Sequence, residues 1–407
     1  MLDAGAPEDF ATIDQLQERV AALPPVRREL AQRLFEIVET EGVIVPPPEM
    51  EPWLARTFGA VEATLRQRII RVTNRWTVEG ATFNTLRSRR PGSGSTQSGA
   101  PATSPATSPA TSPAGPLALA PELRERITAT EGDDFCDPDH RTPADSFGRV
   151  RGRHVVTAAN VAKAEGWHSV AIFDRHDPLA IDAALVADLL EVAGEWAGRA
   201  HERDDAARYF FLLWNCLPRA GASLIHGHAQ MTLSTGMAQS RVELWRAAAA
   251  RYTGETGGDY FADLAAVYRG LGLTVPTRDP AVTMFASLTP AKEREFVLLA
   301  PPWRADERSL ALESLAEPLA AGLDVMIHTL GVRAFNVAIF GPPLPGDGDT
   351  HGDDWAGFPL VARFVDRGNP LAPTSDIAAL ELFGSSVIAS DPFEVARSLR
   401  AETMSWR

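Results

Sequence analysis

Hydrophobic residues recur at helical spacing through the first part of the chain. Between residues 10 and 68 they fall three or four positions apart, as on the buried face of a helix, at Leu16, Val20, Leu23, Leu30, Leu34 and Val38. Three prolines at 46–48 interrupt this pattern before a second helical stretch from Trp53 to Ile69. We therefore expect residues 1–68 to form an N-terminal helical extension, serving either as scaffold or as a partner-binding cap.

The pattern changes from residue 168 onward, where short β-type runs surround a long helical one. Runs of this kind predict strands at 168–174, 209–216 and 224–233. Between the first two, a helix is predicted over residues 182–203 by a single apolar face of Leu185, Leu189, Val192, Trp196 and Ala200.

A weaker copy of the same order follows in the C-terminal half. It has β-type runs at 295–300 and 335–340 around a helical pattern at 310–330. Two copies of strand–helix–strand predict an α+β fold with an internal duplication.

A low-complexity segment interrupts the first half. Pro-Ala-Thr-Ser occurs three times in succession between residues 101 and 112, a composition that cannot bury a hydrophobic core. We interpret residues 92–116 as a disordered linker inserted into a domain. The predicted organisation is a first half at 69–91 and 117–235, followed by a second half and C-terminal segment at 236–407.

Composition and charge narrow the class of protein. Hydrophobic residues make up 45% of the 407 positions, and the net charge of −14 argues against a nucleic-acid or membrane-surface binder. The lysines are Lys163 and Lys292 alone, so phosphate would be held largely by arginine, whose planar fork suits it. The sequence has two cysteines, no recognisable signal peptide and no run of eighteen apolar residues. We therefore expect a soluble cytoplasmic protein.

The segment that specifies chemistry is Ala222-Ser-Leu-Ile-His-Gly-His-Ala-Gln-Met231, which holds His226, His228 and Gln230 at alternating positions. On an extended chain, side chains two positions apart leave the same face, about 7 Å apart. A neutral imidazole can act as nucleophile, base or metal ligand. Because the second copy has no such histidine pair, the chemistry is assigned to the first half.

Three separated segments resemble the galactose-1-phosphate uridylyltransferase family of the histidine-triad superfamily. The family's active-site segment is similar to Trp214-Asn-Cys-Leu-Pro-Arg-Ala-Gly-Ala-Ser-Leu-Ile-His-Gly-His-Ala-Gln230. Its upstream histidine segment resembles Phe173-Asp-Arg-His-Asp-Pro-Leu179, and its early arginine-rich segment resembles Asn84-Thr-Leu-Arg-Ser-Arg-Arg-Pro91. The resemblance implies a histidine-triad-like fold in which each half is an antiparallel sheet with packed helices.

The resemblance also implies roles for the motif residues. His228 would be the nucleophile that attacks the α-phosphorus of a nucleoside diphosphate compound, forming a covalent nucleotidyl-imidazole. Its second ring nitrogen would need an acceptor such as a backbone carbonyl. Gln230 would hydrogen-bond the phosphoryl oxygens, and it stands where histidine-triad hydrolases carry a third histidine. Glutamine is a poorer proton donor than histidine, so this position favours transfer over hydrolysis.

Four further residues match family positions that contact phosphate. Ser223 and Asn215 would donate hydrogen bonds to the developing charge. Arg87 and Arg90 would clamp phosphate groups bidentately.

A structural zinc site is implied as well. In the family, a Cys-x-x-Cys pair joins the upstream histidine and the first histidine of the motif. Here Cys136, His176 and His226 fit, but the second cysteine is replaced by Asp139 with His140 beside it. Both are acceptable zinc ligands, and we expect the softer His140 to complete the set.

The expected function is a nucleotidyltransferase that moves a nucleoside monophosphate from a nucleotide sugar to a phosphorylated acceptor. Gly227 stands where uridylyltransferases carry proline, and we interpret it as relaxing the strand, as in divergent phosphorylase branches. The alternatives are a phosphorylase or hydrolase of ADP-sugars or dinucleoside polyphosphates, or an inactive nucleotide-binding regulatory protein. The expected partners are a nucleotide-sugar or dinucleotide substrate and a second copy of the chain, as in family homodimers.

Overall fold

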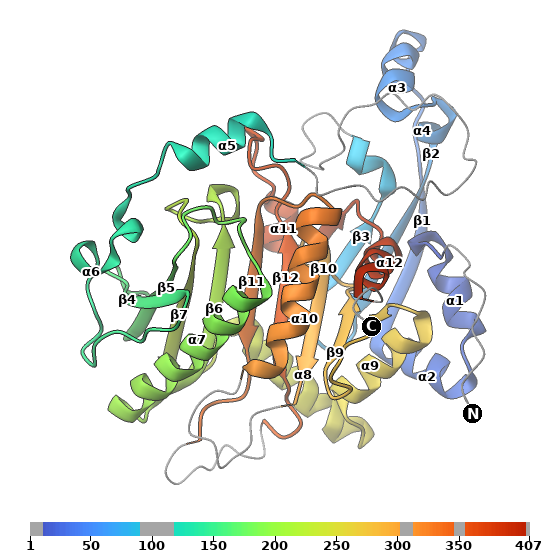
Figure 1. Cartoon of the computed structure of the whole chain (residues 1–407). Coiled ribbons are helices and arrows are strands. Elements are labelled where there is room, and N and C mark those ends of the chain that lie inside the picture. The colour runs from blue at the N-terminus through green and yellow to red at the C-terminus, as the bar shows by residue number, and fades with distance from the viewer. Residues whose placement is uncertain (1–10, 90–117, 302–311, 346–354, 404–407) are drawn as a thin grey trace.

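A nine-stranded antiparallel sheet forms the body of the molecule (Figure 1). The computed structural model describes residues 11–89, 118–301, 312–345 and 355–403. In spatial order the strands are β4 (Val155–Ala159), β5 (Trp167–Phe173), β7 (His228–Thr235), β6 (Ala207–Cys216), β11 (Phe335–Phe340), β12 (Leu360–Asp366), β10 (Glu293–Ala300), β9 (Thr283–Ala286) and β8 (Thr274–Val275).

The chain builds this sheet from two stretches with the same order of elements. Each stretch has two strands, a long helix and two further strands: β4, β5, α7, β6 and β7, then β9, β10, α10, β11 and β12. The two stretches meet in the middle of the sheet between β6 and β11, where Asn215 lies opposite Asn336.

One face of the sheet is covered by helices α7 (Ala183–Arg203) and α10 (Glu313–Asp324), which pack against each other (Figure 1). The α10 helix ends in a π-helical turn, η6 (Val325–Thr329), and α12 (Pro392–Thr403) packs beside it. The apolar face predicted for residues 182–203 is confirmed, because all five of its residues are buried in α7.

The opposite face is covered over the second half of the sheet. Helix α8 (Ser240–Thr256) places Trp245 with its ring centroid 6.1 Å from that of Phe340 and 4.9 Å from the Arg363 guanidinium. Helix α9 (Tyr260–Leu271) packs between α8, α2 (Pro25–Leu34) and β8. Over the first half of the sheet, Leu213 and Asn215 of β6 are half-exposed on this face. This part of the sheet surface is therefore accessible to a ligand.

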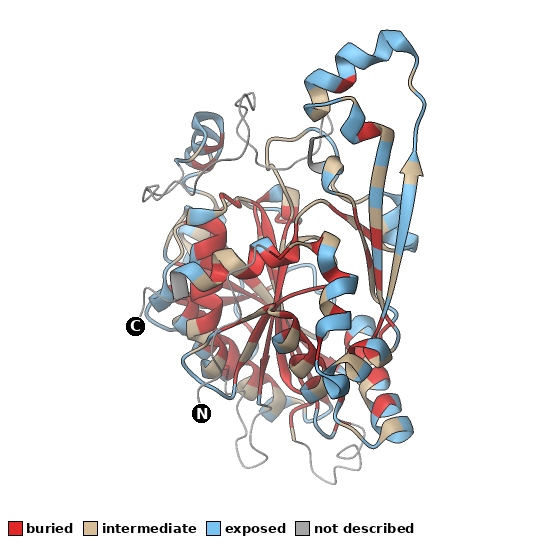
Figure 2. Cartoon of the chain, turned by 90° about the vertical axis from the view of Figure 1, so that its right-hand side faces the viewer, coloured by how far each residue is buried: buried red, intermediate tan, exposed pale blue. Residues whose placement is uncertain are grey.

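A second, four-stranded sheet has the order β1 (Phe35–Val43), β2 (Arg66–Asn74), β3 (Gly80–Phe83) and β13 (Ser386–Ile388), with β13 parallel to β3. The far ends of β1 and β2, with η2 (Pro48–Met50), α3 (Glu51–Phe58) and α4 (Glu62–Leu65), form a largely exposed arm that projects from the body (Figure 2).

The prediction that residues 10–68 are helical is therefore wrong in part. Helices η1 (Ile13–Gln15), α1 (Leu16–Ala22) and α2 occur as expected, but residues 35–43 form a strand. The helical spacing continues to Val38 by coincidence, while β1 pairs with β2 along nine residues and ion pairs join Glu39 to Arg68 and Glu41 to Arg66. Cross-strand pairing, which local periodicity does not report, decides the structure here.

Most other predicted elements are confirmed. Strands β5, β6, β10 and β11 and helices α7 and α10 lie within a few residues of their predicted positions. The motif strand is corrected, because β7 begins at His228 and residues 221–227 form an irregular turn. The predicted linker at 92–116 lies outside the described residues. Across the described part of the chain, none of the helices combines the length and the apolar character needed to cross a membrane.

Candidate functional site

The accessible face of the first half-sheet carries the predicted chemistry. Along β7, Ala229 and Met231 point into the core and are fully buried, so His228 and Gln230 point to the opposite, accessible face. Ile172 and Val170 of β5 lie directly across from these two residues. The sheet thus presents an imidazole and a carboxamide beside an apolar surface.

His228 is held in one tautomer by the backbone. Its Nδ1 lies 2.7 Å from the carbonyl oxygen of His226, and a carbonyl can only accept, so Nδ1 carries the proton and Nε2 keeps its lone pair. Burial lowers the pKa of His228 below the ordinary histidine value. The ring of Phe135 meets it edge-on, with centroids 5.1 Å apart. The result is a neutral imidazole with an unprotonated Nε2.

His226 is held in the opposite tautomer. Its Nε2 donates to the carbonyl oxygen of Phe173 at 2.9 Å, so its Nδ1 carries the lone pair. His176 repeats this arrangement, since its Nε2 lies 3.0 Å from the carbonyl oxygen of Ile127. The two Nδ1 atoms therefore face each other at 3.2 Å. Two lone pairs at this distance repel unless a cation or a proton lies between them.

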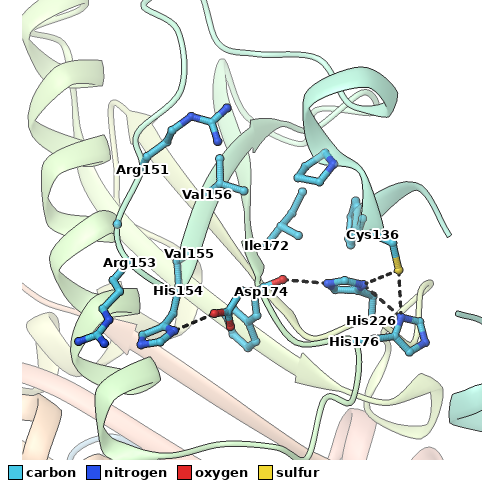
Figure 3. A pocket seen from close by; sticks show the side chains of 14 residues that line it. Cys136, Arg151, Arg153, His154, Val155, Val156, Ile172, Asp174, His176 and His226 are labelled. Carbon is cyan, nitrogen blue, oxygen red and sulfur yellow. Dashed lines mark hydrogen bonds and ion pairs between the residues drawn. The ribbon is translucent and has the colours of Figure 1, made fainter. Parts of the chain in front are cut away.

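Two further groups, the Cys136 thiol and the Asp133 carboxylate, converge on the same point. The Sγ of Cys136 lies 3.4 Å from His176 Nδ1 and 3.5 Å from His226 Nδ1 (Figure 3). Asp133 Oδ1 lies 3.4 Å from His226 Nδ1, and its buried Oδ2 has no hydrogen-bond partner among the described residues. The ligand atoms of all four residues lie within 4.8 Å of one another.

This donor set fits a zinc ion. Two imidazoles, a thiol and a carboxylate are the usual zinc ligands, and both histidines have their second nitrogen fixed by a backbone carbonyl. The orphaned Asp133 oxygen and the opposed Nδ1 lone pairs are both explained by a cation at the centre of the four groups.

The fourth ligand expected from the sequence is corrected. His140 lies on α6 (Pro138–Arg141) with its side chain 82% exposed and hydrogen-bonded to Asp137. Asp139 pairs with Arg149 and Arg151 instead. Asp133 lies beside Cys136 in the cluster instead, at an Asp-x-x-Cys spacing where the family has Cys-x-x-Cys. This spacing, on the N-terminal side of Cys136, is the sequence signal for the position.

A pocket of about 370 Å³ adjoins this cluster (Figure 3). Phe135, Val156 and Ile172 supply an apolar wall, and Val156 and Ile172 belong to a small hydrophobic cluster separate from the main core. Arg151 and Arg153 stand at its edge. The combination suits a flat apolar group attached to an anion.

The structure does not bring the four predicted phosphate-binding residues together in one place. Asn215 lies on β6, where its Oδ1 accepts from Asn336 Nδ2 at 2.7 Å, leaving its own amide protons to donate. Ser223 is exposed on the loop between η5 (Pro218–Ala220) and β7. Arg87 is exposed on η3 (Thr85–Arg89), and its side chain makes no polar contact within the described part of the chain. Arg90 lies outside the described residues.

Besides Asp133, a second residue of the site was not predicted from the sequence. His168 on β5 is buried, and its Nε2 lies 2.9 Å from Gln230 Oε1. The signal was its alternation with Val170 and Ile172, which places it on the same face.

The interpretation of Gly227 is also corrected. A Cβ at this position would lie 2.8 Å from the Phe173 ring and 3.0 Å from the carbonyl oxygen of Arg175. Its N–H donates to the His176 carbonyl and its carbonyl accepts from Phe173 N. Glycine is therefore required for close approach between backbone segments and does not relax the strand.

Comparison with known proteins identifies the fold. No family model and no curated protein matches this sequence. Among solved structures, an ADP-glucose phosphorylase from Arabidopsis thaliana with bound ADP-glucose is similar, with a TM-score of 0.57 and 15% identity over 81% of this chain and 97% of that chain. A GalT-like protein from Arabidopsis thaliana gives a TM-score of 0.53 and 17% identity over 67% and 92%. A uridylyltransferase gives 0.50 and 18% over 65% and 89%.

These neighbours define a class of fold, that of the uridylyltransferase-like and nucleotide-sugar phosphorylase structures. The resemblance to the galactose-1-phosphate uridylyltransferase family is confirmed at the level of the fold, at 15–18% sequence identity.

Proposed function

We propose that this chain transfers a nucleoside monophosphate through a covalent His228 intermediate. The observation that carries the proposal is the hydrogen bond from His228 Nδ1 to the His226 carbonyl at 2.7 Å, which leaves a lone pair on Nε2. This nitrogen belongs to the accessible face of the sheet beside Gln230 and Asn215. A neutral, desolvated imidazole in a fixed tautomer is ready to act as a nucleophile.

The reaction takes place in two displacements. In the first, the Nε2 lone pair attacks the α-phosphorus, and a P–N bond forms as the bond from phosphorus to the bridging oxygen breaks, releasing a sugar phosphate. In the second, an oxygen of the acceptor phosphate attacks the same phosphorus, and the P–N electron pair returns to Nε2. Amide donors on Gln230 and Asn215, and the Ser223 hydroxyl, stabilise the charge on the non-bridging oxygens. Arg87 and Arg90 are proposed to hold the outer phosphates.

A nucleoside diphosphate sugar is the donor we favour. The apolar wall of Phe135, Val156 and Ile172 suits a nucleobase, and ADP-glucose is bound to one structural neighbour. A sugar 1-phosphate as acceptor gives a uridylyltransferase-like reaction, whereas inorganic phosphate gives a phosphorylase by the same two steps. The uncharged carboxamide of Gln230 favours either reaction over hydrolysis.

The metal centre is proposed to be structural. Asp133, Cys136, His176 and His226 would hold zinc, which supplies a cross-link between the segment before β4 and the turn that leads into β7. His226 then fixes the carbonyl that orients His228. Cys136 and Cys216 are free thiols, so a reducing compartment such as the cytosol suits this ligand set.

We also infer that the two halves of the chain descend from a duplicated unit, with a boundary near residue 235. The matching order of strands and long helix in both stretches supports this inference. The histidine pair is confined to the first half, so the second half is its degenerate copy.

The test is to incubate the protein with UDP-glucose or ADP-glucose labelled in the α-phosphate, followed by denaturation. We expect protein-bound label that is lost on acid treatment, as a phosphoramidate requires, and that is absent from His228→Ala. The matched control is His140→Ala, an exposed histidine that should label like the parent chain.

Label that persists in His228→Ala would contradict the proposed nucleophile. Tight nucleotide binding with no label from any donor would favour a regulatory nucleotide-binding protein. Release of labelled nucleoside diphosphate when inorganic phosphate is added would identify a phosphorylase.

A further inference from the structure

His168 makes contacts at both ring nitrogens. Its Nδ1 lies 3.0 Å from the backbone nitrogen of Ala164, and its Nε2 lies 2.9 Å from Gln230 Oε1. The ring is buried in the sheet beside β7. These two contacts join the turn at 160–164 to the carboxamide at the proposed reaction centre.

The backbone contact fixes the tautomer of this ring. The Ala164 N–H can only donate, so His168 Nδ1 must accept and the ring proton must lie on Nε2. A protonated ring, or the other tautomer, would set two N–H groups against each other at 3.0 Å. His168 is therefore a neutral donor toward Gln230. The amide nitrogen of Asn160, 3.2 Å from the same Nε2, finds no acceptor there.

The consequence reaches the substrate side of Gln230. Because His168 Nε2–H requires an oxygen opposite it, Gln230 must direct Oε1 toward His168 and its NH₂ group away from it. Carboxamide orientation is otherwise free to invert. We propose that His168 is a positioning residue, which holds the Gln230 carboxamide with its amide protons toward the phosphoryl oxygens. This inference rests on the proposed nucleotidyl transfer at His228.

A purely structural role for His168 has to be separated from this one. The His168 carbonyl accepts from Asn160 N at 3.0 Å and from Lys163 Nζ at 2.9 Å, so the residue also holds the 160–164 turn. Two amide substitutions divide the roles. His168→Gln places an amide donor near the position of Nε2, while His168→Asn places a carbonyl oxygen near the position of Nδ1.

The experiment measures the single-turnover rate of nucleotidylation of His228 in the full-length protein, using the labelled donor that modifies the parent chain. We expect His168→Gln to keep the rate within a few-fold, and His168→Asn to lower it by about tenfold to a hundredfold, the usual loss when an orienting partner is removed. The KM for the donor should change much less than the rate. The opposite order of the two variants would assign His168 to the turn and overturn the proposal.

A double-mutant cycle supplies the second measurement. If His168 acts through Gln230, then His168→Asn has no further effect on the rate in a Gln230→Ala background. Independent losses that multiply would overturn the proposal. The tautomer is read directly by ¹⁵N-edited NMR of the histidine rings, with the His168 signal assigned by its absence from the variants.

An Nδ1-protonated ring would also overturn the proposal, whatever the activity. The NMR result stands even if no donor labels the protein, so failure of the positioning role is distinguishable from failure of the proposed function.

Discussion

Two histidines separated by one glycine are held in opposite tautomers by backbone carbonyls. His226 donates from Nε2 to Phe173, and His228 donates from Nδ1 to His226. The first is left with a lone pair toward Cys136 and His176, and the second with a lone pair on Nε2. Backbone geometry, rather than any difference between the side chains, therefore separates the proposed metal ligand from the proposed nucleophile.

Asp133 is the residue whose metal role is tested most cleanly. Its Oδ1 also accepts from the backbone nitrogens of Phe135 and Cys136, so Asp133→Asn can keep this cap while losing the carboxylate charge. We expect this variant to bind zinc at least about tenfold more weakly, measured as metal content by mass spectrometry after dialysis against a chelator.

Two variants complete this test. Asp133→Cys restores a zinc ligand and should retain the metal, and His140→Ala should retain it because His140 lies outside the cluster. Full zinc content in Asp133→Asn together with metal loss in His140→Ala would show that His140, and not Asp133, is the fourth zinc ligand.

At the scale of single residues, the sequence predicts those site residues that a local spacing or a family motif marks. His226, His228 and Gln230 were found from their alternation, and His176 and Cys136 from the family resemblance. Asp133 and His168 were not predicted, because the spacing and alternation that mark them locally gain meaning only from contacts with His226 and Gln230, 93 and 62 positions away along the chain.

Among the elements, α7 connects the sequence pattern to the site most directly. It begins at a cap in which Asp182 accepts from Leu185 N at 2.8 Å, and it packs beneath β4 to β7. Its predicted and observed boundaries agree because the cap, the apolar face and the length all act locally. For β1 no such agreement was possible, since its partner strand begins more than twenty residues later.

The α7 cap yields a pH-dependent prediction. Asp182→Ala should lower the free energy of unfolding by about 1 kcal/mol at pH 7, measured by chemical denaturation. The Leu185 N–H, with help from Arg175, lowers the pKa of Asp182 below its usual value. The stabilisation is thus full above about pH 4 and is lost as the pH falls through the lowered pKa.

The difference between variant and parent should therefore shrink in strong acid. An unchanged difference at pH values below the titration of Asp182 would show that the carboxylate charge plays no part. Asp204→Ala serves as the control, because Asp204 lies at the C-terminal end of α7 and does not cap its N-terminus.

At the scale of the whole molecule, the second sheet is joined to the first through a buried ion network. Arg363 of β12 contacts Glu295 of β10 at 2.6 Å and Glu79, next to β3, at 2.8 Å. Asn74 adds a hydrogen bond to Tyr260 at 2.8 Å. These polar contacts fix the position of the arm-bearing sheet against the body.

Arg363→Ala should lower the free energy of unfolding by about 3–5 kcal/mol, because it leaves the buried Glu295 and the half-buried Glu79 without a cation. Arg66→Ala, which removes an exposed pair with Glu41, should cost no more than about 1 kcal/mol. Urea denaturation followed by circular dichroism measures both, and similar losses in the two variants would count against the buried network.

The pairing of β6 with β11 makes the first half of the chain depend on the second. The second half, which lacks the histidine pair, supplies Asn336, which donates to Asn215 Oδ1 and to the Ala220 carbonyl. It also supplies Arg367, which donates to Asn336 Oδ1. It also covers what would otherwise be an open edge of β6. A gene shortened to the first half would encode the proposed nucleophile without the contacts that hold Asn215, a proposed phosphate-binding residue. If the proposed duplication is right, the second half is retained because it supports the first half structurally, although it lacks the histidine pair.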